Sequence, residues 1–156
     1  MNPLLQTTKA GILERQVLKL AHQDDPVFSD SHILKAIEAY DIEGSTKHRA
    51  QEFVNALTPL WELYHKGSYV NLFKKFIDME FNLETFSYEY SPHVNHVIKE
   101  FLFGYNILMN CEYLKTEYKF NEGKDNPDSL FGKLFFSWMA ASLLHDIGYE
   151  LVVSKT

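Results

Sequence analysis

The chain has 156 residues, which suits one domain with a single core, and its 46% hydrophobic and 15% aromatic content excludes an extended disordered chain. The formal net charge of -6 argues against a nucleic-acid backbone as the main partner, because proteins that bind one usually carry a basic face. The single cysteine excludes an internal disulfide.

Neither the N-terminal residues nor the most apolar stretch predicts an export or membrane segment. Lys9 and Arg15 interrupt the apolar residues near the N-terminus, which is atypical of a signal peptide. The most apolar stretch, residues 134–144, is shorter than the roughly 20 residues that a bilayer span needs. We therefore expect a soluble, cytoplasmic protein without a membrane partner.

Apolar residues recur at spacings of three and four along most of the chain, which predicts helices throughout. The first helix is expected within residues 5–20. A second should follow, with Ser29 or Asp30 as its N-cap, and close at Gly44. These two helices have the amphipathic pattern of elements that cover a core.

The third helix should begin near residues 45–46 and end before residue 67, with Pro59 inside it as a cause of a kink or a split. Ser68 then opens a short fourth helix. From residue 78 to residue 90 the apolar periodicity fades, and we expect an acidic, aromatic connection there.

The fifth helix is predicted from Pro92 to about Cys111, with Ser91 as its N-cap. Residues 116–129 read as a polar loop. A sixth, almost wholly apolar helix should run from about Asp128 to Gly148.

Two faces of the fifth helix are apolar, which indicates a central position in the fold. Phe103 and Ile107 add a second flank to its main face, which consists of Val94, Ile98, Phe101, Tyr105 and Leu108. The fold class is therefore predicted as all-α, a compact bundle of about six helices in which the fifth and sixth pack together. We divide the chain into an N-terminal helical segment, residues 1–78, and a metal-binding helical segment, residues 79–156, which together form one unit.

The sixth helix ends in a hydrophilic pair, His145 and Asp146, after a run of residues that favours burial. A buried carboxylate beside an imidazole is costly unless a positive charge pairs with them, and a metal ion is one solution. The alternative is a helix C-cap, in which the histidine faces the negative end of the helix dipole and the aspartate forms a local turn.

His96 is the expected third ligand, because it projects onto an apolar flank of the fifth helix and not onto its polar strip. Packing of the two apolar helices would bring it to the pair at residues 145–146. A buried histidine bonded to a backbone carbonyl is the alternative for His96. His93 competes for the role of ligand, since histidines three apart on a helix can hold zinc.

Residues 96–107, HVIKEFLFGYNI, and residues 140–150, AASLLHDIGYE, resemble two helices of the HD superfamily of metal-dependent phosphohydrolases. The resemblance covers about residues 91–150. It implies an HD-like helical bundle in which His96, His145 and Asp146 bind a divalent ion, with Mn, Fe, Co, Ni, Zn and Mg as candidates. It also implies that Asp146 is a catalytic residue that orients a water molecule. The implied reaction is hydrolysis of a small phosphorylated substrate, a phosphoester for which a nucleotide is one candidate.

One part of the family pattern has no counterpart, because the family supplies a further aspartate downstream and this sequence ends ten residues after Asp146, in LVVSKT. Glu100 and Glu150 are the nearest substitutes. A fragment, a truncated paralogue and a site completed differently all stay open. The alternative function is a catalytically incomplete HD-like helical protein that acts in ligand binding or in subunit association, for example as a homo-oligomer.

Overall fold

A computed structural model of the chain describes residue 15 and residues 30–86, 93–123 and 126–147. These ranges are helical and contain no strand, so the predicted all-α bundle is confirmed for the described part of the chain. The helix expected within residues 5–20 lies outside the described residues. The helices are α3 (Asp30–Tyr40), α4 (Thr46–Leu63), α5 (Ser68–Phe86), α6 (Val94–Asn110), α7 (Glu112–Glu117), α8 (Phe120–Gly123) and α9 (Leu130–Leu144).

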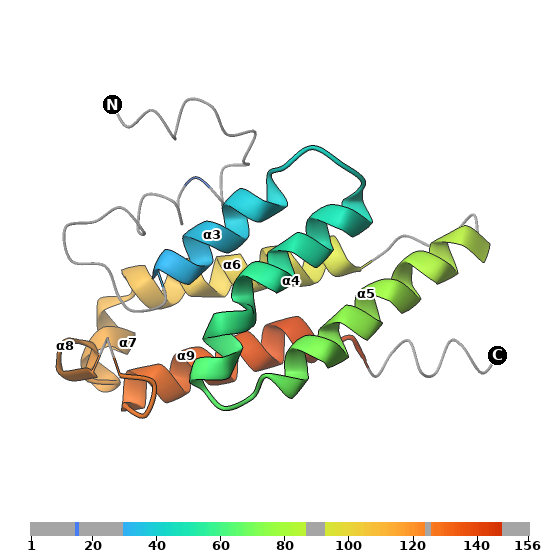
Figure 1. The fold of residues 1–156 in the computed structure, drawn as a ribbon. Coiled ribbons are helices and arrows are strands. Elements are labelled where there is room, and N and C mark those ends of the chain that lie inside the picture. Colours follow the sequence, from blue (N-terminus) through green and yellow to red (C-terminus); the bar gives the residue numbers. More distant parts are fainter. Residues whose placement is uncertain (1–14, 16–29, 87–92, 124–125, 148–156) are drawn as a thin grey trace.

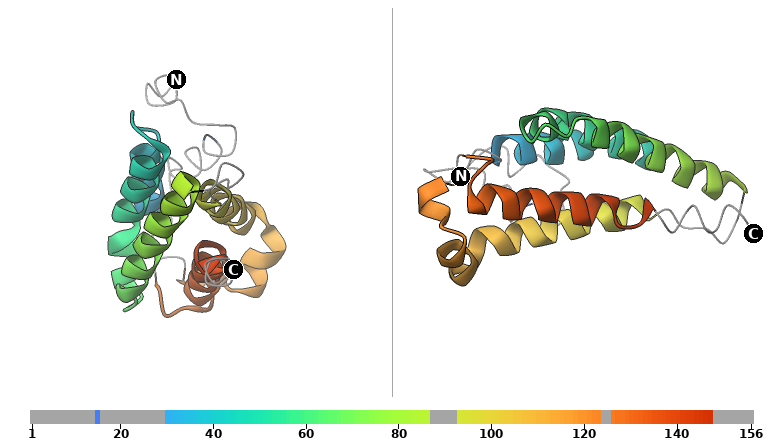
Figure 2. Two further views of the ribbon diagram at one scale, coloured as in Figure 1. Left: turned by 90° about the vertical axis from the view of Figure 1, so that its right-hand side faces the viewer. Right: turned by 90° about the horizontal axis from the view of Figure 1, so that it is seen from below.

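The helices form two layers (Figures 1 and 2). Helices α3, α4 and α5 make one layer, and α6 with α9 makes the other. The short helices α7 and α8 lie at one end, where they connect α6 to α9. Because α6 and α9 run antiparallel, the N-terminal end of α6 lies beside the C-terminal end of α9.

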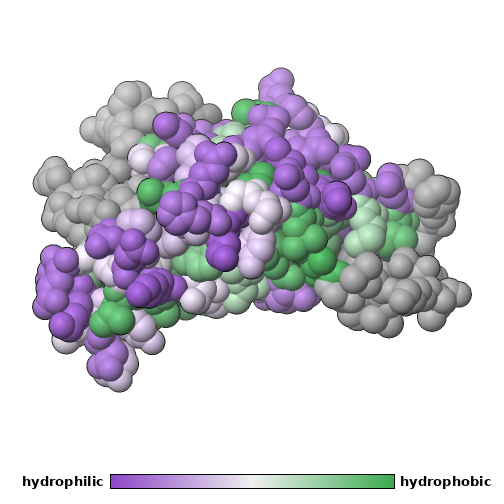
Figure 3. Space-filling model, turned by 60° about the horizontal axis from the view of Figure 1, so that its bottom comes forward, coloured by the Kyte–Doolittle hydropathy of each residue, from purple (hydrophilic) through white to green (hydrophobic). Residues whose placement is uncertain are grey.

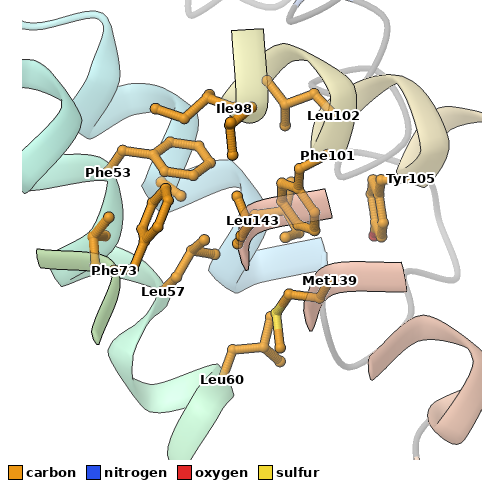
Figure 4. Close-up of a cluster of buried hydrophobic side chains, with 14 of the residues drawn as sticks. Phe53, Leu57, Leu60, Phe73, Ile98, Phe101, Leu102, Tyr105, Met139 and Leu143 are labelled. Carbon is orange, nitrogen blue, oxygen red and sulfur yellow. The ribbon is translucent and has the colours of Figure 1, made fainter. Parts of the chain in front are cut away.

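The core fills the space between the two layers (Figure 4). Its labelled members are fully buried and come from α4, α5, α6 and α9. Burial of one such side chain contributes about 1.5–3 kcal/mol, so this cluster holds the two layers together. The labelled core residues are Phe53, Leu57, Leu60, Phe73, Ile98, Phe101, Leu102, Tyr105, Met139 and Leu143.

The predicted pairing of the two apolar helices is confirmed by close contacts between α6 and α9. The Tyr105 and Phe135 rings meet edge to face with their centroids 5.6 Å apart. The Trp138 indole lies across Gly104, where an added Cβ would come within 1.9 Å of Cε2, and its Nε1 donates to the carbonyl oxygen of Phe101 at 3.0 Å. A residue without a side chain is therefore required at this crossing.

Helix α5 corrects the prediction of a connection after residue 78. It runs to Phe86, across the predicted division between residues 78 and 79. The missed part continues the face on which Ile77 is buried and places Glu80, also fully buried, on that face. A carboxylate at a core position broke the apolar periodicity on which the prediction depended.

Of the two predicted effects of Pro59, a kink or a split, the split does not occur, because α4 contains Pro59 within one element. A further prediction differs from the structure. The predicted polar loop at residues 116–129 contains α8 and the end of α7, while Ser129 caps α9 by accepting the Gly132 N–H at 2.9 Å. Short helices of this kind have too few residues for a periodic pattern to be recognised.

Only one of the two apolar flanks of α6 is buried. Phe103 is 58% exposed and Ile107 is 44% exposed, so the central position predicted for this helix is wrong on that side. Among the described helices, none has the combination of length and apolar content that crossing a bilayer requires.

Candidate metal centre

Two of the predicted ligands meet where the N-terminal turn of α6 lies against the C-terminal end of α9. The ring centroids of His96 and His145 are 6.5 Å apart, with an angle of 71° between the ring planes. The packing of α6 on α9 brings them together, as the sequence predicts. Side-chain exposure is 60% for His96 and 39% for His145, so both imidazoles can be reached from solvent.

The carboxylate of Glu100 lies between the two imidazoles. Its Oε1 is 2.9 Å from His96 Nε2, and its Oε2 is 3.4 Å from His145 Nε2. Glu100 follows His96 by four residues, the spacing that places two side chains on one helix face. One ligand atom from each of these three residues lies within 4.8 Å of the other two.

The two ring nitrogens of His145 have different partners. Nδ1 is 2.9 Å from the carbonyl oxygen of Ser142, to which it donates when it carries the proton. Nε2 then presents its lone pair to the cluster, which is the orientation that a backbone carbonyl commonly gives to a metal-binding histidine. His145 is also the C-cap residue of α9, so the predicted alternative, a capping role, is compatible with a ligand role.

Asp146, the third predicted ligand, lies beside the cluster but is not among the residues whose ligand atoms converge, which are His96, Glu100 and His145. The Asp146 Oδ1 is 3.1 Å from His145 Nε2, and the side chain is 25% exposed. Two carboxylates, Glu100 and Asp146, therefore face one imidazole nitrogen. Two like charges around one nitrogen repel, and a positive charge between them, from the protonated imidazole or from a bound ion, offsets that repulsion.

The distances within the cluster suit a divalent ion. Around an ion with bonds of about 2.1 Å, adjacent ligand atoms lie about 3.4 Å apart in a tetrahedron and about 3.0 Å apart in an octahedron. The separations from Glu100 to the two imidazole nitrogens, 2.9 and 3.4 Å, lie near these values, and the ligand atoms of the three residues all lie within 4.8 Å of one another. Two imidazoles with carboxylates also form a mixed nitrogen and oxygen donor set, which transition metals and zinc prefer over magnesium.

His93, the competing ligand, has a different partner. Its Nδ1 is 3.6 Å from Oε1 of the buried Glu80, on the side of α6 that faces α5. The structure does not include it among the residues that could share an ion with His96. Glu150, the second substitute for the downstream aspartate, lies outside the described residues, whereas Glu100 occupies the position that its spacing from His96 indicates.

No protein-family model, curated protein or solved structure matches the chain. The resemblance to the HD superfamily therefore stays a prediction from the sequence. What the chain does must be inferred from the chemistry of this cluster.

Proposed function

We propose that the protein is a divalent-metal-dependent phosphohydrolase of the HD type, acting on a phosphoester, with a nucleotide as a candidate substrate. The observation that carries the proposal is the convergence of His96, Glu100 and His145 within 4.8 Å at an exposed junction of two helices. The resemblance of residues 96–107 and 140–150 adds the reaction class.

In this proposal each side chain has a separate role. A bound divalent ion would lower the pKa of a water molecule and stabilise negative charge on a phosphoryl oxygen. His96 and His145 would hold the ion through Nε2, and Glu100 would supply a carboxylate oxygen. Asp146, with Oδ1 3.1 Å from His145 Nε2, orients the attacking water and accepts its proton.

The first test is metal-dependent turnover of the purified chain. We expect hydrolysis of p-nitrophenyl phosphate, bis-p-nitrophenyl phosphate or nucleoside phosphates after loading with Mn²⁺, Fe²⁺, Co²⁺, Ni²⁺, Zn²⁺ or Mg²⁺, and loss of turnover with a chelator. Asp146→Ala should lower kcat by about 10²–10⁴-fold, as removal of a general base does. Asp128→Ala, which removes an exposed carboxylate just before α9, is the matched control. Metal-free protein without turnover under every loading condition would refute the proposal.

Subunit association is a second candidate, favoured by exposed apolar side chains. Phe103, Ile107 and Leu130 are 58%, 44% and 51% exposed on α6 and α9. The face that Figure 3 presents is largely hydrophilic but includes a patch of hydrophobic side chains. Large exposed apolar surfaces mark interaction sites more often than chance allows.

Sedimentation velocity tests this association directly. We expect a concentration-dependent dimer that Phe103→Ser shifts toward monomer, because the change removes exposed apolar area without touching the core. Leu72→Ser, at an exposed position on α5, is the control and should leave the distribution unchanged. A monomer for the unmodified chain at all concentrations would contradict this second function and leave the hydrolase proposal untouched.

A further inference from the structure

Glu80 is a fully buried carboxylate on α5 that contacts the beginning of α6. Its Oε2 accepts hydrogen bonds from the backbone N–H groups of His93 and, at 3.2 Å, of Val94. Its Oε1 is 3.6 Å from His93 Nδ1. Burial of a carboxylate is costly without such partners, so these contacts account for its presence in the core.

Among the described residues at the start of α6, no local side chain performs this task. His93 is the N-cap residue, and its side chain makes no capping hydrogen bond. The first amides of a helix have no partner within the helix, and they lie at the positive end of its dipole. The carboxylate of Glu80 on α5 therefore binds amides that the His93 side chain does not cap.

We propose that Glu80 is a positioning residue for the metal centre, because it fixes the turn of α6 from which His96 projects. The inference rests on the proposed metal-binding function. His96 has 60% side-chain exposure, so surrounding packing does little to hold it and its position depends on the backbone of this turn. Glu80 and the ion would each favour the same ordered turn, and they are therefore thermodynamically coupled.

The test compares Glu80→Gln and Glu80→Ala in the full chain. The glutamine keeps a hydrogen-bond acceptor and loses the charge, whereas the alanine loses both. Calorimetric titration with Zn²⁺ and with Mn²⁺ should give a Kd raised about 10-fold for the alanine, which is the scale of effect for residues that orient a ligand, and an intermediate value for the glutamine. Hydrogen exchange of the metal-free protein should be faster at the amides of residues 93–97 in both variants.

Ile77→Ala is the matched control, since Ile77 is also fully buried on α5, one turn before Glu80. It should lower the melting temperature without raising the Kd more than about twofold, because a residue without a hydrogen-bonding group caps no amide. Equal weakening by Ile77→Ala would overturn the inference and reduce Glu80 to a general stabilising role.

An unchanged Kd in both Glu80 variants would overturn it as well, whatever the melting temperature does. If the unmodified chain binds neither ion, the proposed function fails and the positioning role falls with it. Exchange at residues 93–97 separates the two failures, because faster exchange in the metal-free variants establishes the capping of α6 independently of any ion.

Discussion

Replacement of His145 by alanine is expected to weaken divalent-ion binding by more than about 100-fold, since loss of even an outer partner of a ligand costs about 10–100-fold. Its Nε2 is the atom that faces both carboxylates, 3.4 Å from Glu100 Oε2 and 3.1 Å from Asp146 Oδ1. Without the His145 ring, the Glu100 and Asp146 carboxylates and the His96 imidazole remain, so one of the two nitrogen ligands is lost. Metal content after dialysis and the Kd from titration calorimetry measure the change.

His48→Ala is the control for this experiment, because His48 is an exposed histidine at the start of α4 and has no part in the cluster. The variant should bind the ion as the unmodified chain does. His145→Ala also removes the contact of the ring with Ser142, which should cost only about 1 kcal/mol of folding free energy. An ion bound equally well by both variants would leave the helix-cap role as the only explanation of His145.

The largest expected loss of stability comes from Gly104→Ala, which places a Cβ within 1.9 Å of the Trp138 indole. Overpacking of this kind costs about 1–3 kcal/mol or more in free energy of unfolding. For a chain of this size that corresponds to a melting temperature lower by roughly 2–12 °C, measurable by calorimetry or circular dichroism. The indole cannot move aside freely, because its Nε1 is bonded to the carbonyl oxygen of Phe101.

Gly67→Ala is the matched comparison. An added Cβ at Gly67 would meet only the Glu62 side chain, at 3.5 Å, which is an ordinary contact. This variant should change the melting temperature by no more than a degree or two, whereas Trp138→Phe in the Gly104→Ala background should recover part of the loss by freeing space. Equal melting temperatures for the two glycine variants would show that the close packing of α6 on α9 is not needed.

Much of the site could be predicted because its positions follow from two strong helical patterns. The apolar runs of α6 and α9 required the two helices to pack, and the packing placed His96 near the pair at residues 145–146. Glu100 was identifiable from its spacing of four from His96. The exposure of the site to solvent could not be predicted. His96 projects between Phe103 and Ile107, which indicated a buried apolar flank, but this flank faces solvent.

Other features depend on contacts that a linear pattern does not contain. The second half of α5 was missed because Glu80 occupies a core position, and only the amides of another helix make that position favourable. The prediction of Ser91 as the N-cap of α6 is wrong, because the helix begins at Val94 and His93 is its N-cap residue. Gly104 gave no signal, since a glycine required by an indole on another helix resembles any other glycine in a sequence.

The antiparallel arrangement of α6 and α9 joins the two helices through α7 and α8 at one end, while His96 and His145 lie at the other. An ion held there would act as a reversible cross-link across the free ends of a hairpin. Because the packed helices form the site, such an ion would bind the folded chain and not the unfolded one, and would stabilise the fold more as its concentration rises. Supply of metal in the cell would then govern how much of this chain stays folded, in addition to whether it can react.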